Sequence, residues 1–355
     1  MPAPGMADLT GIGAEPRGES MRRSAILHAI VVVLVTLLMA GGPDAAKGKT
    51  PAAESLGGNE GGAGARFERY RVDYFDNFYG IASGSPSGCW IVGNSGRILF
   101  SADGGKIWQI QAGGTVENLY AVTSVDARRA WACGGSGTIL HTEDGGANWI
   151  RQNTPLRHPI FRIQFVNAKV GYTCGYYGLF LRTVDGGKTW EDKSIGEDVT
   201  LRGMYFLSEK EGYVVGEFGT ILKTQDGGSS FSRLPSPSEQ TLFTAFFSDL
   251  RTGYAAGIDG IIIKTTDGGR SWMKEDSGVR DHLVGLCGKG QTIVAVGLRG
   301  AVTVKGPEGK WNPADAKTLN WISGVLLTGD KQGFAVGAHG TILRLEDIIG
   351  KAGGR

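Results

Sequence analysis

The folded part of the chain is a succession of short apolar stretches separated by turn sequences rich in glycine. One apolar stretch opens each unit, as in LYAVTS from Leu119, LRGMYF from Leu201 and LFTAFF from Leu242. A second stretch ends at a glycine, and a two-residue turn between two glycines leads to a third. An Asp-Gly-Gly turn then leads to a fourth stretch that starts with Trp. Turn residues at these intervals predict four short β-strands in each unit.

The unit occurs seven times. Its central tract is clearest in WIVGNSGRILFSADGGKIW, which runs from Trp90 to Trp108. The first glycine of the tract recurs in four steps of 41 residues and two of 40, at Gly93, Gly134, Gly175, Gly216, Gly257, Gly297 and Gly337. The last two copies have lost the Asp-Gly-Gly turn. Seven units of about 40 residues with four strands each predict an all-β fold, a seven-bladed β-propeller with four antiparallel strands per blade.

The seventh unit lacks a fourth strand, because the chain runs out soon after Asp347. In the other units the opening strand of the next unit follows the Trp position by 11 residues, as from Trp108 to Leu119. Counting back 11 residues from Phe78 leads to Phe67, the start of FERYRV. We therefore expect this N-terminal strand to complete the last blade and to remove the free sheet edges. The propeller then occupies residues 67–349.

The N-terminal region has the pattern of an export signal. Arg22 and Arg23 precede an apolar run of 16 residues, from Ala25 to Ala40, and small residues follow. Residues 21–46 are therefore expected to be a signal peptide or an N-terminal anchor, since the run is shorter than the roughly 20 residues that span a bilayer. We expect an exported protein, periplasmic or membrane-anchored and facing the periplasm, or the thylakoid lumen in a phototroph. Residues 1–20 are expected to be a mis-assigned start or disordered, residues 47–66 a flexible linker, and residues 350–355 a disordered tail.

Composition narrows the classes of function. Glycine supplies 59 of 355 residues, more than twice its usual share of roughly 7%, and the repeated turns account for much of the excess. The net charge of +2 provides no strong field to attract nucleic acid. Four cysteines are too few for a disulfide scaffold and five histidines show no metal spacing, so we expect buried thiols and neither a cofactor nor a metal. We also expect a monomer.

The aspartates of the Asp-Gly-Gly turns are expected to be structural. An Asp in such a turn accepts hydrogen bonds from nearby backbone N–H groups, and glycine adopts positive φ without steric cost. A shared metal site is not expected, because each carboxylate belongs to a different blade. The residues concerned are Asp103, Asp144, Asp185, Asp226 and Asp267.

The tract S/T-x-D-G-G-x-x-W resembles the Asp-box, or BNR repeat, of sialidases, sortilin-like receptors and other propellers. Joined to the preceding glycine tract, as in GYVVGEFGTILKTQDGG from Gly212 to Gly228, it resembles more closely the photosystem II stability and assembly factor family and its bacterial relatives. The resemblance extends from Phe67 to Asp347. It implies a non-catalytic propeller on the lumenal or periplasmic side of a membrane, which acts as a chaperone-like assembly factor. Its partner would be a protein client, a subunit of a membrane complex.

Two arginines interrupt an otherwise regular pattern near the predicted channel. The third residues of the opening strands are small except at Arg162, and Arg202 stands one place earlier in the next blade, where other blades have aromatic residues. The family that the chain resembles has an arginine-rich patch that contacts its client, and these two arginines resemble members of it. The loops on the same end of the blades collect further arginine, histidine and aromatic residues: Arg151, Arg157, His158, Tyr176, Tyr177, Phe218, Arg280, His282, Arg299, Trp321 and His339. Arginine and aromatic residues are enriched at interfaces, but solvated loop residues are an equally open interpretation.

Two other functions stay open. A carbohydrate-binding or cell-surface-binding propeller is favoured if Tyr176, Tyr177 and Trp321 form an exposed platform. A sialidase-like glycoside hydrolase is suggested by Phe161, Arg162 and Ile163, which are close to the Phe-Arg-Ile-Pro of sialidases. Gln164 stands where that proline belongs, and the even spacing of the boxes is not typical of sialidases.

Overall fold

The computed structural model describes residues 68–69 and 73–349. The chain divides into two compact units, Met1–Leu56 and Gly57–Arg355, and every described residue belongs to the second. The expected signal or anchor, the linker and the C-terminal tail lie outside the described residues. Among residues 73–349, no helix has the length and apolar character needed to cross a membrane.

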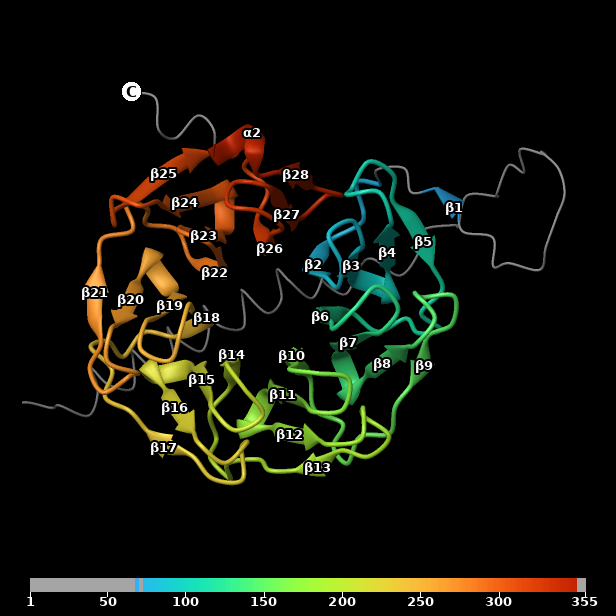
Figure 1. Ribbon diagram of the computed structural model, residues 1–355, viewed down its shortest axis with the longest axis horizontal. Helices are drawn as coiled ribbons and strands as arrows, with labels where there is room; N and C mark the ends of the chain where they lie inside the picture. Colours follow the sequence, from blue (N-terminus) through green and yellow to red (C-terminus); the bar gives the residue numbers. More distant parts are fainter. Residues whose placement is uncertain (1–67, 70–72, 350–355) are drawn as a thin grey trace, which may run out of the picture. The chain divides into compact units, whose positions relative to one another are not determined.

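The described residues form seven antiparallel sheets, called here blades 1 to 7 in sequence order (Figure 1). Blade 1 contains β2 (Phe78–Ser83), β3 (Cys89–Gly93), β4 (Ile98–Ser101) and β5 (Gln109–Gln111). Blade 2 contains β6 (Leu119–Ser124), β7 (Ala130–Gly134), β8 (Ile139–Thr142) and β9 (Ile150–Arg151). Blade 3 contains β10 (Ile160–Phe165), β11 (Gly171–Gly175), β12 (Phe180–Thr183) and β13 (Glu191–Asp192). Blade 4 contains β14 (Leu201–Phe206), β15 (Gly212–Gly216), β16 (Ile221–Thr224) and β17 (Ser232–Arg233). Blade 5 contains β18 (Leu242–Phe247), β19 (Gly253–Gly257), β20 (Ile262–Thr265) and β21 (Met273–Glu275). Blade 6 contains β22 (Leu283–Lys289), β23 (Thr292–Gly297), β24 (Ala301–Lys305) and β25 (Trp311–Asp315). Blade 7 contains β26 (Ile322–Leu327), β27 (Gly333–Gly337) and β28 (Ile342–Arg344).

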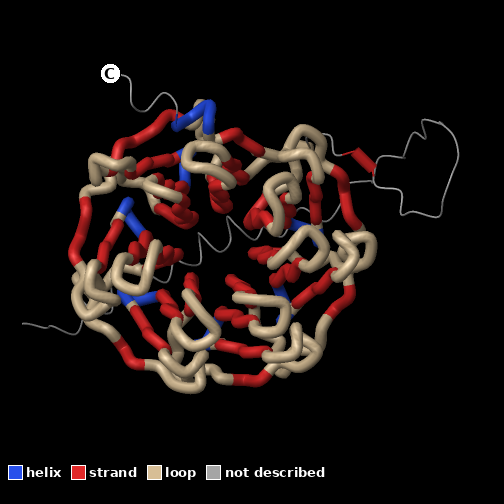
Figure 2. Tube along the Cα trace, viewed as in Figure 1, coloured by secondary structure: helices blue, strands red, loops and turns tan. Residues whose placement is uncertain are grey.

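The sheets stand side by side in a ring, with strands and loops alternating around it (Figure 2). The innermost strand of each blade packs on that of the next, and β26 packs on β2, which closes the ring. The predicted seven-bladed propeller is confirmed.

The core lies between neighbouring blades, because the second strand of a blade is buried on both faces. Aromatic residues of the second strand stack on a phenylalanine of the next blade at three of these boundaries. Trp131 lies 3.7 Å from Phe165, and Tyr172 lies 3.7 Å from Phe206, measured between ring centroids. Tyr213 and Phe247 stack at 3.9 Å in the same way. Each blade therefore depends on its neighbours for the burial that stabilises it.

The prediction that an N-terminal strand completes blade 7 is wrong. The strand β1 (Glu68–Arg69) pairs with β5, on the outer edge of blade 1. Blade 7 has three strands among the described residues. Its link to blade 1 is made further inside, where the Ser323 hydroxyl donates to the backbone oxygens of Phe78, at 2.8 Å, and Tyr79, at 3.1 Å.

A helical turn takes the place of the missing strand. In the other blades the aromatic residue at the start of the fourth strand, Trp in five and Phe231 in blade 4, packs against the preceding blade, as Trp190 does against the core of blade 2. In blade 7 this place belongs to Leu345 and to α2 (Glu346–Ile349), whose Ile348 and Ile349 are buried against β-strands of blade 6. Apolar side chains at the end of the chain thus bury the surface that a strand would have covered.

This arrangement predicts that Ile348→Ala destabilises the propeller. Ile348 is 6% exposed, and truncation of a buried isoleucine costs about 2–5 kcal/mol through lost burial and the cavity left behind. Urea unfolding of the parent and variant measures the change. Ile107→Ala is the control, because Ile107 is 41% exposed and its truncation is expected to cost less than about 1 kcal/mol. Equal unfolding midpoints for Ile348→Ala and the parent would contradict the role of α2.

Candidate functional site

One end of the ring is formed by the hairpin turns between the second and third strands and by the loops that lead from one blade to the next. We call it the turn face, and the opposite end, which carries the Asp-boxes, the box face. The hairpin turns contain η1 (Asn94–Gly96), η2 (Gly135–Gly137), η3 (Tyr176–Gly178), η4 (Glu217–Gly219), η5 (Ile258–Gly260) and η6 (Leu298–Gly300).

Every hairpin on the turn face has two consecutive residues with positive φ. In blade 1 they are Ser95, at 51°, and Gly96, at 70°, and the Arg97 N–H donates to the Asn94 oxygen at 3.0 Å. This is the type I′ turn, which is favoured in two-residue hairpins because its twist matches that of the strands. The second position is glycine in all seven blades, and the first is occupied by Ser95, Ser136, Tyr177, Phe218, Asp259, Arg299 and His339.

A bulky side chain at the first position is strained. The left-handed conformation costs an L-residue about 1–2 kcal/mol, and only Asn, Asp and Gly adopt it readily. Tyr177 and Phe218 nevertheless occupy it in neighbouring blades, and they are 49% and 59% exposed. Little burial compensates for the strain at these two positions. Backbone strain of this kind, kept at exposed aromatic residues, points to a function for them.

The innermost strands carry a second repeated feature, a β-bulge near the start of each one. The pairing with the second strand shifts at the same place in all seven blades, for example between Leu201 and Gly203. A bulge turns the extra residue away from its usual direction. The seven bulge residues, called here the collar, are Tyr79, Tyr120, Phe161, Arg202, Phe243, Val284 and Ser323.

Much of the collar is a continuous run of aromatic contacts. Tyr79 stacks on Trp321 at 5.6 Å and meets Tyr120 edge-on at 5.7 Å, and Tyr120 contacts Phe161 at 5.6 Å. The guanidinium carbon of Arg202 lies 4.6 Å from the centroid of the Phe161 ring, so a cation ends the run.

Arg202 is held beneath the aromatic turns of blades 3 and 4. Its Nη2 lies 3.7 Å from Oε1 of Glu217, and the other carboxylate oxygen of Glu217 accepts a hydrogen bond from the Thr200 N–H at 2.9 Å. Burial lowers the pKa of the Arg202 guanidinium, Glu217 opposes that shift, and the positive charge of Arg162 adds to it. The ion pair and the aromatic ring fix the position of the cation.

Arg162 projects into the central channel. Its Nη2 donates to the backbone oxygen of Val284 in blade 6 at 3.1 Å, and its Nη1 donates to the Phe161 oxygen at 3.5 Å. The surrounding cavity of about 190 Å³ is lined by small residues from the other blades, such as Gly80, Ala121 and Gly324. Burial lowers the pKa of this guanidinium as well. Both contacts of Arg162 are to neutral oxygens, so its charge is not balanced by them.

The structure brings together some of the residues singled out in the sequence and separates others. Tyr176 and Tyr177 lie 4.2 Å apart between ring centroids, and His158, beside the exposed Arg157, contacts Tyr177. These residues share blades 3 and 4 with Arg162 and Arg202. Arg280 and Arg299 are exposed on blade 6, beyond blade 5, where Arg299 lies 3.9 Å from Asp281. Trp321 packs on Tyr79 beside blade 7, so it does not form a platform with Tyr176 and Tyr177.

The Asp-boxes are closed by their own hydrogen bonds. In blade 5, the Thr265 hydroxyl donates to Asp267 at 2.8 Å and accepts the Gly269 N–H at 2.8 Å, and Asp267 accepts the Ser271 N–H and hydroxyl. These Ser271 contacts lower the pKa of Asp267 to about 2. Because this pKa is lower than that of an unfolded aspartate, the box stabilises the fold above about pH 4, and the contribution is lost as the pH falls toward 2. The pKa values of Asp103, Asp144, Asp185 and Asp226 are lowered as well.

Thiols and metal ligands add no second site. Cys89, Cys133, Cys174 and Cys287 are free, and burial raises the pKa of each. Such thiols are poor nucleophiles at neutral pH. Within residues 73–349, no three His, Cys, Asp or Glu side chains are grouped so that they could bind a metal ion.

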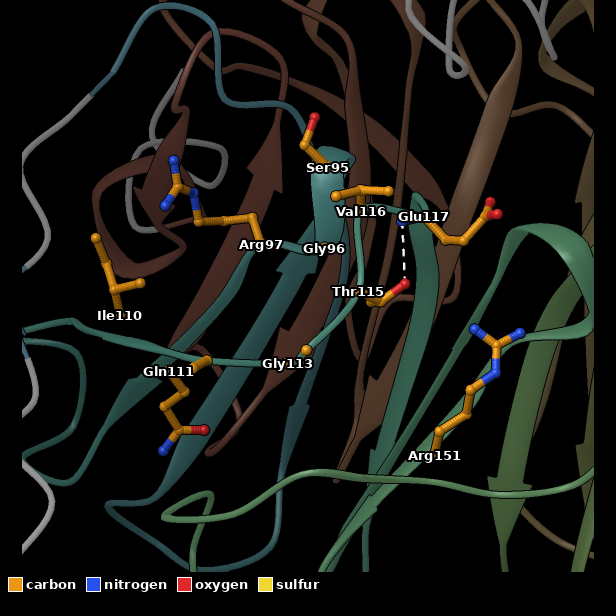
Figure 3. A pocket seen from close by; sticks show the side chains of 12 residues that line it. Ser95, Gly96, Arg97, Ile110, Gln111, Gly113, Thr115, Val116, Glu117 and Arg151 are labelled. Carbon is orange, nitrogen blue, oxygen red and sulfur yellow. Dashed lines mark hydrogen bonds between the residues drawn. The ribbon is translucent and has the colours of Figure 1, made fainter. Parts of the chain in front are cut away.

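A hollow of about 570 Å³ lies on the turn face between blades 1 and 2 (Figure 3). The side chains of Arg97 and Arg151 lie on either side of it, and Glu117 is the one carboxylate in its lining. Arg97 is paired with Asp76 at 3.1 Å. A glycosidase needs two carboxylates about the scissile bond, and this hollow does not supply the pair.

Comparison with protein families identifies a matching family model. The model described as photosynthesis system II assembly factor YCF48 matches residues 63–159 and 151–240, which together make up half of the chain. No curated protein matches the chain in sequence.

Solved structures with the same fold include two of YCF48. The structure of YCF48 bound to a D1 peptide has a TM-score of 0.66 and 18% identity, and the match covers 79% of this chain and 94% of that chain. YCF48 from Cyanidioschyzon merolae has a TM-score of 0.65 and 16% identity, with 79% and 98% covered. The GH74 xyloglucanase from Xanthomonas campestris has a TM-score of 0.63 and 12% identity, with 78% of this chain and 53% of that chain covered. At these identities the likeness shows the fold alone.

The box geometry predicts that Thr265→Val destabilises the propeller by about 1–3 kcal/mol. The substitution keeps the shape of the buried side chain but removes the acceptor of the Gly269 N–H, which then stays buried without a partner. Thr266→Val is the matched control, because the neighbouring Thr266 is exposed. Thermal unfolding of both variants measures the effect, and equal shifts for the two would contradict the structural role of the box.

The turn geometry predicts that Phe218→Asn stabilises the propeller by about 1 kcal/mol. The substitution creates Asn-Gly, the sequence that type I′ turns prefer, and removes an exposed ring that contributes little burial. A rise in the unfolding midpoint is expected. Leu319→Asn is the control, because Leu319 is 81% exposed but is not among the residues with positive φ. If Phe218→Asn is no more stable than the parent, the turn is not strained.

Proposed function

Because the chain belongs to the family of the photosynthesis system II assembly factor YCF48, we propose that it is a non-catalytic binding protein that holds a segment of a protein client on its turn face. Its client is a subunit of a membrane or periplasmic complex, and the propeller acts as a scaffold or chaperone while that complex is assembled. The relative that was solved with a D1 peptide supports a protein client.

The observation that carries this proposal is the pair of strained, exposed aromatic residues on neighbouring blades. Tyr177 and Phe218 keep about half of their surface in solvent while they occupy a conformation that disfavours them. A partner that buries these rings would offset the free energy that the left-handed backbone conformation costs. Aromatic residues held rigidly in this way are typical of the centres of binding interfaces.

The charges beneath the aromatic turns favour an acidic group on the client. Arg162 and Arg202 bring two guanidinium groups to blades 3 and 4, and Glu217 pairs with Arg202, while Arg162 contacts neutral oxygens. The net positive charge at this place is complementary to a carboxylate of the client segment. An extended segment with an apolar side chain next to an acidic residue fits both features.

The cellular setting follows from the sequence pattern. The export signal or anchor expected at residues 21–46 supports a protein that acts outside the cytoplasm, in the periplasm or at the membrane facing it. A monomer suits this role, since a closed ring leaves the turn face accessible.

The proposal predicts that Tyr177→Asn combined with Phe218→Asn weakens client binding about tenfold or more while the propeller stays folded. Fluorescence anisotropy with labelled peptides from the soluble segments of membrane-complex subunits, a D1 peptide among them, measures the affinity. The two substitutions relieve strain, so a loss of binding is not explained by unfolding. Arg202→Gln is expected to lower the affinity for the same peptides and to reduce the salt dependence of their binding.

Val184→Asn is the matched control, because Val184 is similarly exposed but lies on the box face. It is expected to bind as the parent does. The proposed function fails if no peptide binds the parent, or if the turn-face variants bind every peptide as tightly as Val184→Asn does.

A further inference from the structure

Blade 6 departs from the repeat on the box face. Lys305 pairs with Ile293 at the place where Thr265 pairs with Gly253 in blade 5, so a lysine stands where the intact boxes have Ser or Thr. The following residues, Gly306-Pro307-Glu308-Gly309, do not contain the Asp-Gly-Gly sequence of an intact box. An ammonium group has therefore replaced the hydroxyl of a box, and the box carboxylate has been lost.

Blade 6 also lacks a phenylalanine at the end of its innermost strand. Phe165, Phe206 and Phe247 end the innermost strands of blades 3 to 5, and each stacks on an aromatic residue of the preceding blade. Gly288 occupies the corresponding position in blade 6, opposite Ile293. Tyr254 of blade 5 is therefore not stacked by a ring from the innermost strand of blade 6, and Trp311 of blade 6 contacts it edge-on, at 6.1 Å between ring centroids.

A cavity of about 510 Å³ lies where these changes meet. Its walls include the rings of Tyr205, Phe246 and Tyr254, and its other lining contains glycine-rich backbone, at Gly288, Gly290, Gly306 and Gly309. Pockets of about 300–1,000 Å³ with aromatic walls and a few polar groups are typical of small-molecule sites.

The cavity has an excess of positive charge. Lys264, Lys289 and Lys305 line it. Glu275 is the carboxylate that pairs with two of them, at 2.5 Å from Lys305 and 3.7 Å from Lys264. The ammonium group of Lys289 donates to the neutral Thr328 oxygen at 2.6 Å. Asp330, whose carboxylate lies next to Gly290, is a second acidic group at the rim, so the three lysines leave an excess of about one positive charge beside the aromatic rings.

We propose that this cavity between blades 5 and 6 is a binding site for a small organic anion that carries a flat ring. The ring lies against the aromatic wall formed by Tyr205, Phe246 and Tyr254, and a carboxylate or phosphate group contacts the ammonium groups of Lys289 and Lys305. Glycines at the rim let the backbone approach the ligand closely. The site lies on the box face, so it is separate from the proposed client-binding turn face.

Phenyl phosphate is a suitable probe, because it combines a flat ring with an anion. Isothermal titration of the full chain is expected to show one saturable site, with phenyl phosphate at least about tenfold tighter than inorganic phosphate, since the ring adds aromatic contact. Lys289→Met is expected to weaken the affinity about tenfold, and Lys305→Met to weaken it by at least as much. Gly288→Phe displaces the aromatic wall, because a Cβ at Gly288 would lie 2.3 Å from Cε1 of Phe246, and it is expected to abolish binding.

Two exposed lysines that do not line the cavity supply matched controls. Lys274→Met and Lys331→Met remove the same charge from the surface, and both are expected to bind the probe as the parent does. Lys305 is buried, so its variant is compared only if it unfolds cooperatively, whereas the exposed Lys289 tests the site without that requirement. Absence of saturable binding to the parent overturns the proposal, as does equal affinity of Lys289→Met and Lys274→Met. Peptide binding on the turn face is expected to be unchanged in Lys289→Met, so failure of this site and failure of the client site are distinguishable.

Discussion

The packing of each blade on its two neighbours is the constraint on which the structure depends. The second strand of a blade is apolar on both faces, so one sheet alone would expose as much apolar surface as it buries. Stacked pairs such as Tyr172 and Phe206 form only when the next blade is in place. A closed ring buries both apolar faces of every blade, provided that the last blade packs on the first. The chain seals this last boundary with β26 on β2. The side chains of Leu345, Ile348 and Ile349 cover the preceding boundary, between blades 6 and 7, in the position of an absent tryptophan.

The periodic part of this fold could be predicted because the residues that mark it, such as glycine in a turn, each suit only a few backbone conformations. Glycine at the second turn position and tryptophan at the fourth strand recur at a fixed interval, and an interval is visible without coordinates. The closure could not be predicted by the same count. An 11-residue step says how far a strand lies along the chain, but it does not say which exposed sheet edge the strand pairs with. The apolar pair Ile348 and Ile349 was the available signal, and its place against blade 6 depends on tertiary packing.

The candidate site was only partly visible in the sequence, for a related reason. Arg162 and Arg202 stood out because their columns otherwise hold small or aromatic residues. Phe218 drew attention as one loop residue among many, since nothing in the letters EFG shows that its backbone is left-handed. Glu217, which pairs with Arg202, was not singled out, because the pairing depends on the turn of the same blade folding back over the bulge. The cavity beside blade 6 was not apparent in the sequence, because the changes in this blade show there only as a lost Asp-Gly-Gly turn.

The type I′ turns have a consequence for how this scaffold can change. In six of the seven blades their first residue is exposed, whereas His339 stacks on Tyr74. The shape of the hairpin is set by the twist of the strands and by the following glycine, so the identity of an exposed first residue is nearly independent of the core. Seven such positions are arranged around one end of the ring, and four of them carry large side chains. A lineage, or a protein engineer, can therefore exchange the chemistry displayed there one blade at a time. Each exchange of a turn residue therefore alters what the turn face recognises, while the seven blades beneath it keep their structure.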